Sequence, residues 1–351
     1  MAHNEIYSVN TRQLSGMLQQ CLEANVVPMI HGSPGIGKSA ITGNVSNNNN
    51  LMLIDHRLST AAPEDQTGLP FKCEDGFARF APFADLFPLQ STPLPEGKDG
   101  WLLFLDELNS ASKAVMASAY KLILDRMTGQ HKLHDRCMIV GAGNLNTDRA
   151  IVNNIGTALQ SRMVHLELRV DHRVWMEDVA YTQNYDERII GFLNQFPERL
   201  MDFRPDHTDR TFCCPRTWEF MNRLVTSPEG KPREVLDSSA ALYAGTITSG
   251  TAVEFISYCR NAAKLITIDR VLADPKGCPV PHEAAIKWAT VTHLLSKHTM
   301  DNLGKVLEYV ERFDASFKIM FVRALVIRNN TVTGHPAFAL FLSKMTNLLN
   351  D

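Results

Sequence analysis

One stretch limits the folds open to this sequence more than any other: Gly32-Ser33-Pro34-Gly35-Ile36-Gly37-Lys38-Ser39. It matches the phosphate-binding pattern G-x-x-x-x-G-K-[ST] at every fixed position. A short apolar run from Val26 to Ile30 precedes it and indicates a buried strand, and a segment able to begin a helix follows. Because the pattern requires a strand before it and a helix after it, this context predicts a phosphate-binding loop in an α/β fold.

Each residue type in the stretch has a chemical role. Three glycines allow the backbone to curl until successive N–H groups point at one anion, and the helix beginning at Lys38 adds its positive dipole end. Lys38 would reach the β- and γ-phosphates of a nucleotide, and the Ser39 hydroxyl would bind Mg²⁺. A glycine-rich turn without a ligand is the alternative, but such a turn needs neither group. We therefore predict nucleotide contacts from Gly32, Ser33, Pro34, Gly35, Ile36, Gly37, Lys38, Ser39 and Ala40.

A second signal is the run of five bulky apolar residues from Trp101 to Leu105, which ends in Asp106-Glu107. Such a run is typical of a strand buried on both faces, and the carboxyl end of a parallel strand lies beside the ligand crevice. We predict that Asp106 binds Mg²⁺, directly or through water, and that Glu107 polarises an attacking water as general base. The alternative is a strand followed by an acidic helix start.

Two further residues are candidates for phosphate contacts. Asn144 follows the apolar segment from Cys137 to Val140, where its amide can orient water and touch a γ-phosphate or form an Asx turn. Arg216 lies in the first turn of a predicted helix that opens at Cys214-Pro215. A cation there is unfavourable for the helix dipole, which indicates that Arg216 serves an anion.

Length and periodicity predict more than one domain, because 351 residues exceed what one hydrophobic core usually supports. Five apolar strand signals with helices between them predict a three-layer α/β domain with a five-stranded parallel sheet over residues 1–170. Beyond it the strand signals stop and helical periods continue. We predict an all-α lid domain at residues 171–269 and a C-terminal helical extension at residues 270–351.

Composition favours a cytoplasmic protein. The seven cysteines are scattered without a C-x-x-C pair, which is typical of reduced thiols. The N-terminus does not resemble a signal peptide, and no apolar run approaches the roughly 20 residues of a membrane helix. The net charge of −3, from 35 basic and 38 acidic residues, gives no overall attraction to nucleic acid or anionic membranes.

A long insertion from Ser59 to Gly100 separates the second and third strand signals and is rich in Pro, Gly and charge. We expect it to be irregular and to carry the partner- or pore-facing surface, because it contains five phenylalanines, at positions 71, 77, 80, 83 and 87. The alternative is a local mini-core over the sheet. Phe71 is the best candidate for exposure, because Gly68-Leu69-Pro70 would stiffen a turn just before it.

Taken in order, five motifs give the chain a resemblance to the AAA+ ATPases over roughly residues 10–225: Gly32–Ser39, Leu102–Glu107, Gly143-Asn144, Ser161-Arg162 and Pro215-Arg216. Within that class it looks most like the MoxR-type branch, including phage-encoded members. This finer likeness rests on Asp55-x-Arg57, Pro63-Glu64-Asp65, Gly68-Leu69-Pro70 and Asp148.

The resemblance implies a ring, usually a hexamer, that binds ATP and Mg²⁺ at each subunit junction and hydrolyses ATP to remodel or assemble a macromolecular client. Asn144 would be sensor 1, Arg162 the arginine finger and Arg216 sensor 2. The segment before Arg162 lacks the acidic and aromatic residues common in MoxR proteins, which leaves Arg149 and Arg126 as rival fingers. In the MoxR branch the partners include von Willebrand factor A-type domain proteins, and the location implied is a bacterial or phage-infected host cytoplasm.

Three other functions remain open from the residues alone. The first is an ATP-dependent assembly switch with little turnover, although Glu107 beside Asp106 favours turnover. The second is a DNA-acting motor or loader, for which the sequence shows no basic, aromatic-interleaved stripe. The third is a small-molecule kinase, against which Arg216 at the start of a lid helix argues.

Overall fold

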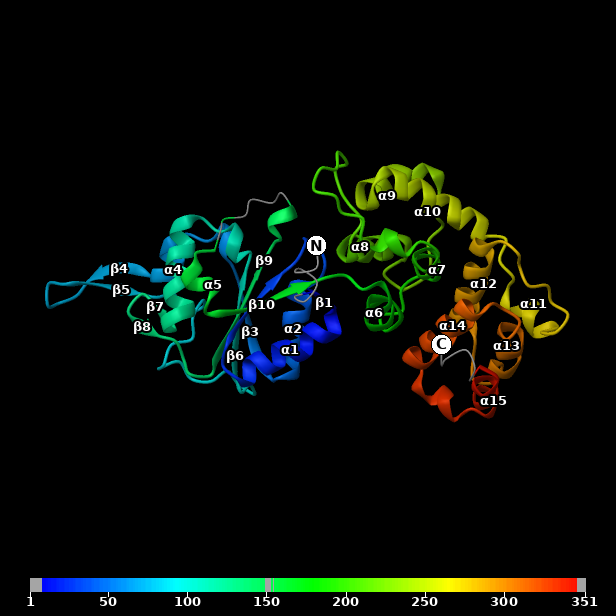
Figure 1. Ribbon diagram of the computed structural model, residues 1–351, viewed down its shortest axis with the longest axis horizontal. Coiled ribbons are helices and arrows are strands. Elements are labelled where there is room, and N and C mark those ends of the chain that lie inside the picture. Colours follow the sequence, from blue (N-terminus) through cyan, green and yellow to red (C-terminus); the bar gives the residue numbers. More distant parts are fainter. Residues whose placement is uncertain (1–7, 149–152, 154, 346–351) are drawn as a thin grey trace. The chain divides into compact units, whose positions relative to one another are not determined.

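The computed structural model describes residues 8–148, 153 and 155–345. The chain divides into two units, the first formed by residues 1–171 with 204–206 and the second by residues 172–203 with 207–351. The first unit contains a β-sheet with helices, and the second is built from helices (Figure 1).

The sheet of the first unit has six parallel strands in the order β1-β10-β2-β9-β6-β3. Their bounds are Ser8–Val9 for β1, Val27–His31 for β2, Leu51–Arg57 for β3, Gly100–Asp106 for β6, Cys137–Gly143 for β9 and Met163–Leu168 for β10. The predicted α/β fold with a parallel sheet is confirmed. The predicted count of five strands misses β1, which is two residues long and therefore too short to show alternation in the sequence.

Helices cover both faces of this sheet (Figure 1). Their bounds are Thr11–Glu23 for α1, Lys38–Asn48 for α2, Lys113–Asp125 for α4 and Thr157–Gln160 for α5. Every residue of β6 is buried, as expected for a strand covered on both faces. Its alternate residues Trp101, Leu103 and Leu105 join one core with α4 side chains, so the remaining β6 side chains point to the opposite face.

Strand order decides which loops meet at the carboxyl edge of the sheet. β9 pairs with β2 on one side and with β6 on the other. The loop after β2 begins at Gly32, β6 ends at Asp106, and Asn144 follows β9 directly. Because the three strands are parallel neighbours, these segments emerge side by side.

The insertion between β3 and β6 is more regular than expected. It contains a short helix, α3 (Pro63–Thr67), and an antiparallel hairpin of β4 (Leu69–Lys72) and β5 (Ala78–Ala81), drawn in light blue in Figure 1. All eight residues of β4 and β5 are exposed, so neither strand has the buried face that makes alternation visible in a sequence.

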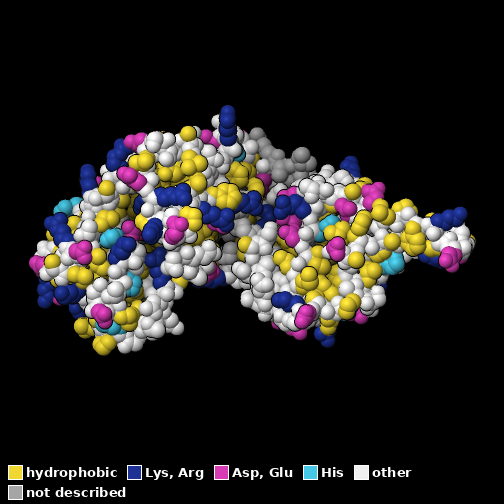
Figure 2. Space-filling view, turned by 180° about the vertical axis from the view of Figure 1, so that it is seen from behind, with side chains coloured by type: hydrophobic (Ala, Val, Ile, Leu, Met, Phe, Trp, Pro, Cys, Tyr) yellow, Lys and Arg dark blue, Asp and Glu magenta, His cyan; other side chains and the backbone are white. Residues whose placement is uncertain are grey.

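The insertion's phenylalanines fall into two groups. Phe71 and Phe77 are 48% and 70% exposed, and Phe80 and Phe83 are also exposed, whereas Phe87 is buried in the core beneath α4. The predicted exposure of Phe71 is therefore confirmed, and the mini-core alternative holds only for Phe87. Figure 2 shows hydrophobic side chains along this hairpin and charged side chains of both signs toward its end.

The second unit contains the helices α6–α15, with a π-helical segment at Met176–Tyr181. Their bounds are His172–Trp175 for α6, Glu187–Gln195 for α7, Pro215–Val225 for α8, Ala240–Ile247 for α9, Ser249–Ala262 for α10, Ile268–Ala273 for α11, Ala284–Lys297 for α12, Leu303–Val310 for α13, Ala315–Arg328 for α14 and Pro336–Met345 for α15. The separation of a lid from a C-terminal extension within this unit stays a prediction. No helix among the described residues is long and apolar enough to span a bilayer.

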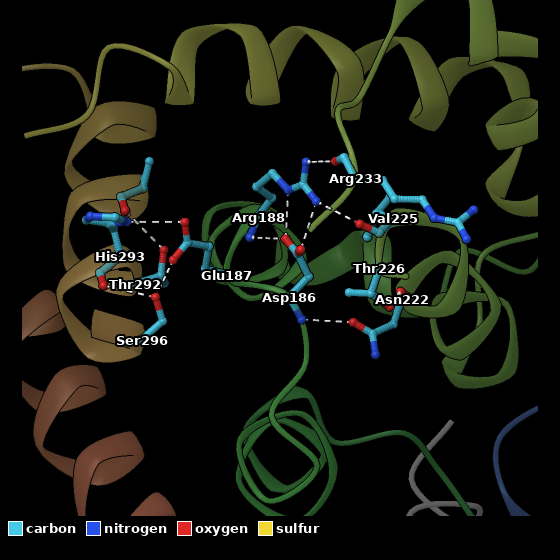
Figure 3. Close-up of polar contacts among 11 residues, drawn as sticks. Asp186, Glu187, Arg188, Asn222, Val225, Thr226, Arg233, Thr292, His293 and Ser296 are labelled. Atoms are coloured by element: carbon cyan, nitrogen blue, oxygen red, sulfur yellow. Dashed lines mark hydrogen bonds and ion pairs between the residues drawn. The ribbon is translucent and has the colours of Figure 1, made fainter. Parts of the chain in front are cut away.

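A largely buried polar network connects α7 to its neighbours (Figure 3). Asp186 caps α7 by accepting from the Arg188 N–H at 2.9 Å, and both its carboxylate oxygens accept from the Arg188 guanidinium at 2.8 Å. The same guanidinium donates to the carbonyls of Val225, at 3.0 Å, and Arg233, at 2.6 Å. The network thus fixes the end of α8 against the start of α7.

We predict that Asp186→Ala lowers the free energy of unfolding of the second unit by about 3–5 kcal/mol, because it removes a helix cap and leaves the largely buried Arg188 charge without its carboxylate. The matched control is Glu219→Ala, which breaks the exposed pair with Arg223 and should cost under about 1 kcal/mol. Urea unfolding followed by circular dichroism compares the two variants. Equal losses would contradict a structural role for the network.

Candidate active site

The loop after β2 favours glycine at three positions, at two because of backbone conformation and at one because of limited space. Gly35 and Gly37 have φ values of +79° and +101°, in the region that side chains disfavour. At Gly32 a Cβ atom would lie 2.4 Å from Ile36 Cδ1 and 3.1 Å from the Leu168 carbonyl oxygen. Glycine at these positions therefore allows the loop to turn tightly between β2 and α2.

The N-terminus of α2 is left open to an anion. Its N-cap residue is Gly37, which offers no side-chain cap, and its first turn contains no acidic residue. Lys38 occupies the first helical position, where a cation is unfavourable for the helix dipole. Backbone N–H groups and a lysine at one helix end are together suited to phosphate.

Lys38 is only 9% exposed, and its ammonium group has polar partners on the loop. Nζ donates to the carbonyl oxygens of Gly32 at 2.6 Å and Ser33 at 3.1 Å, and to Asn144 Oδ1 at 3.3 Å. The contact with Asn144 follows from strand register, because Gly143 pairs with His31, the residue before Gly32. The structure thus brings together two residues that the sequence predicted as phosphate contacts.

The two predicted magnesium ligands also lie together. Ser39 Oγ donates to Asp106 Oδ2 at 3.4 Å, and Asp106 Oδ1 accepts from the Glu107 N–H at 2.9 Å. Hydroxyl and carboxylate oxygens suit Mg²⁺, which usually takes one or two protein ligands and completes its shell with water and phosphate. The donor set therefore fits Mg²⁺, although no group of three or more His, Cys, Asp or Glu that could hold a metal occurs among the residues described.

Glu107 is held by two residues that the sequence did not identify as part of the site. Its backbone has φ +55°, uncommon outside glycine, and its Oε2 accepts from the Ser59 hydroxyl. Arg57 places Nε 3.9 Å from Glu107 Oε1 and Nη2 3.4 Å from Asp106 Oδ2. Arg57 ends β3 and is the register partner of Asp106, which ends β6. Its place at the end of an apolar strand signal is the one feature of the sequence that could have identified it.

A histidine pair lies at the base of the loop. His165 Nε2 is 2.9 Å from the Gln160 carbonyl oxygen, which can only accept, so a neutral His165 ring donates there and accepts at Nδ1 from His31 Nε2, also at 2.9 Å. Burial is the main cause that lowers the pKa of His31 to about 4, and repulsion from Lys38 and from a protonated His165 acts in the same direction, against the opposing effect of Glu167. His31 is therefore neutral near pH 7 and adds no charge beside the loop.

The candidate arginines lie in different surroundings. Arg162 is exposed at the end of α5 and donates to its own helix at the Ala158 carbonyl, 2.8 Å away. Arg126 turns inward, with Nη2 donating to the carbonyls of Cys137 and His134, which gives it a structural role before β9. Arg216 is exposed in the first turn of α8, in the second unit, and Arg149 lies outside the described residues.

No protein-family model and no curated protein match this chain. Similar solved structures include a Cytophaga hutchinsonii protein described as a candidate ATPase, with TM-score 0.38 and 11% identity over 92% of this chain and 77% of that one. They also include Thermotoga maritima RuvB, a Holliday junction branch migration motor, with TM-score 0.38 and 16% identity over 75% of this chain and 74% of that one. A point mutant of that RuvB gives TM-score 0.40 and 16% identity over 75% of each chain.

Proposed function

We propose that the protein is a Mg²⁺-dependent ATPase of the AAA+ class that acts as a ring on a macromolecular client. The observation that carries the proposal is that two hydrogen-bonded pairs of side chains lie together at the carboxyl edge of the sheet. Lys38 contacts Asn144, and Ser39 contacts Asp106, with Glu107 beside them. These side chains are of the kinds needed to bind a nucleoside triphosphate, hold its metal ion and position a water molecule.

Hydrolysis then requires little covalent chemistry from the protein. Lys38 exchanges its carbonyl partners for phosphate oxygens, and the N–H groups of the loop and α2 contact the same anion. Ser39 and Asp106 would hold Mg²⁺, which neutralises charge developing on the phosphate oxygens. Glu107 accepts a proton from the attacking water, and the Asn144 amide orients that water.

The ring and its client are supported by different observations. Arg162 is exposed at a helix end, where it is available to a neighbouring subunit. A hexamer, the MoxR branch, a phage origin, a von Willebrand factor A-type client and a cytoplasmic location rest on the motif resemblance alone. Sensor 2 stays our proposal for Arg216 on the strength of its exposed place in a helix's first turn.

The hairpin of β4 and β5 supports a polypeptide client. Its exposed aromatics exceed what a solvated loop needs. Its charges are balanced between Lys72, Glu74, Asp75 and Arg79, and Arg79 is paired with Asp75, so the hairpin offers no excess of cations to a phosphate backbone.

We predict that Glu107→Gln keeps ATP affinity within about twofold and lowers turnover about 10²–10⁴-fold, because the phosphate and metal contacts remain while the base is lost. Steady-state phosphate release and ATP titration measure the two quantities. Glu74→Gln, at an exposed hairpin carboxylate, is the matched control and should turn over normally.

The comparison variant for Glu107→Gln is Lys38→Ala, which should weaken ATP binding itself because the lysine contacts phosphate in the ground state and the transition state. Unchanged affinity in Lys38→Ala would mean that the loop is only a turn. Wild-type turnover in Glu107→Gln would remove Glu107 from the mechanism.

Mixing two inactive variants tests whether Arg162 is an arginine finger that acts on the neighbouring subunit. Arg162→Ala subunits should bind ATP normally and hydrolyse it about 10³–10⁵-fold more slowly. Mixed with Glu107→Gln subunits, they should recover activity, since some junctions then combine an intact Glu107 with an intact Arg162. Arg260→Ala, at an exposed arginine paired with Asp237, is the control and should retain activity alone. A mixing titration without recovery would rule out Arg162 as a finger acting between subunits.

We predict that Phe71→Ala keeps basal turnover within about twofold and loses the stimulation that a permanently unfolded polypeptide gives to the wild type, because the exposed ring contacts the client. Turnover is measured across a titration of that polypeptide. Phe87→Ala, at the buried phenylalanine of the same insertion, should instead destabilise the protein by about 3–5 kcal/mol. Unfolding of Phe71→Ala, or stimulation equal to wild type, would contradict a client-facing role.

A further inference from the structure

Asn109 is a buried polar side chain two residues beyond the proposed base, Glu107, and it is only 2% exposed. Its amide pairs with both backbone groups of a single residue. Nδ2 donates to the Asn144 carbonyl oxygen at 2.8 Å, and Oδ1 accepts from the Asn144 N–H at 3.1 Å. Asn109 thus binds the backbone of the residue whose side chain contacts Lys38.

The pairing occurs where the sheet ends. β9 continues to Gly143 beside β2, whereas its pairing with β6 stops at Leu105 and Gly141. On the β6 side Asn144 has no strand partner, and the Asn109 amide supplies the donor and acceptor that a strand would give. A Cβ atom on Gly143 would lie 2.2 Å from Asn109 Oδ1, so glycine at 143 permits the amide to approach.

The other end of the connection is the turn that carries Glu107. Ser110 N–H donates to the Glu107 carbonyl at 2.9 Å, which closes a short turn around Asn109. The carbonyl of Asn109 also accepts from the Asn153 N–H at 2.7 Å. One short turn therefore holds the proposed base and binds the backbone of the residue proposed to orient the water.

We propose that Asn109 is a positioning residue for ATP hydrolysis. In this role it acts through Asn144 and does not itself contact the nucleotide or the attacking water. Through its two hydrogen bonds to the Asn144 backbone it sets the distance and direction of the Asn144 amide relative to Glu107 and Lys38. The inference rests on the proposed ATPase function and adds to it the residue that fixes the geometry of the site.

The decisive variant is Asn109→Asp, which keeps the shape and changes one hydrogen bond. The new carboxylate still accepts from the Asn144 N–H, but its second oxygen faces the Asn144 carbonyl oxygen without a proton to donate. Protonation restores the missing donor. Burial and the nearby carboxylates of Asp106 and Glu107 raise the pKa of the new group, whereas Lys38 beyond Asn144 lowers it. Activity should therefore return as the pH falls through that pKa.

The experiment measures the turnover of Asn109→Asp as a ratio to wild type between about pH 5.5 and about pH 8.5, in steps of about half a unit. We expect a loss of about 10²-fold in kcat at the alkaline end and a ratio that approaches wild type at the acidic end, with ADP affinity within about twofold throughout. Asn109→Leu, whose side chain has neither a hydrogen-bond donor nor an acceptor, should lose turnover at every pH without recovery.

Asn194→Asp is the matched control, because the Asn194 amide also donates to a backbone carbonyl, that of Ile190, in the second unit. The turnover of Asn194→Asp relative to that of the wild type should not change with pH. A constant ratio for Asn109→Asp, or wild-type turnover at the alkaline end, would overturn the positioning role.

A second measurement separates this inference from the proposed function. The affinity for ATP relative to ADP reports the γ-phosphate contact of Asn144 and needs no turnover. Asn109→Asp should lower that ratio at alkaline pH and restore it at acidic pH. If the wild type binds ATP without hydrolysing it, the ATPase proposal fails while this test still decides the role of Asn109. The inference would be overturned if Asn109→Asp left the ratio of ATP affinity to ADP affinity unchanged, or if the wild type bound no nucleotide.

Discussion

The pairing of β9 with both β2 and β6 is the constraint on which the site depends. It places Asn144 opposite the start of the loop that carries Lys38, and it leaves Asp106 and Glu107 at the end of the next strand along. A different strand order would separate the lysine from the carboxylates even with every motif intact, because each motif is local to its own strand end. The apolar run of β6, buried on both faces, fixes that strand in the interior of the sheet.

Charge balance within the site shows how it can be stable and still accept a ligand. Lys38 is compensated by two loop carbonyls and the Asn144 amide, and Glu107 is compensated by Ser59 and Arg57. Asp106 has Ser39 and Arg57 as partners. Each charged group therefore has a polar partner that phosphate, Mg²⁺ or water could replace, so the proposed binding would exchange one set of contacts for another and would not fill an unsatisfied site. The low pKa of His31, caused first by burial, keeps a further cation from forming beside Lys38 at neutral pH.

Sequence patterns predicted the parts of this structure that are determined locally. The central strands, the phosphate loop and the acidic strand end each produce a periodicity or a spacing, and the α/β fold followed from them. The strand order has no local signal, so the contacts of Ser59 and Asn109 were not predictable, although both residues lie close in sequence to a strand end or motif. β1 was too short to detect, and the hairpin of β4 and β5 lacks a buried face. Arg126, a rival finger under the family resemblance, has carbonyl partners that only tertiary structure reveals.

The same geometry connects the proposed base to the exposed hairpin within the first unit. Glu107 accepts from Ser59, at the start of the insertion, and Arg57 on β3 contacts both site carboxylates. His56, the residue before Arg57, contacts Gln66 of α3, and Thr128 donates to the Gln66 carbonyl at 2.6 Å. Gly68, at the end of α3, packs so closely on the Ala81 backbone that a Cβ atom there would lie 2.2 Å from its carbonyl oxygen. Partly buried contacts at Glu107, buried hydrogen bonds at Gln66 and a close backbone contact at Gly68 thus lead from the proposed base to the root of the hairpin. These contacts form an unbroken path of neighbouring residues from the proposed base to the strand that carries Phe71.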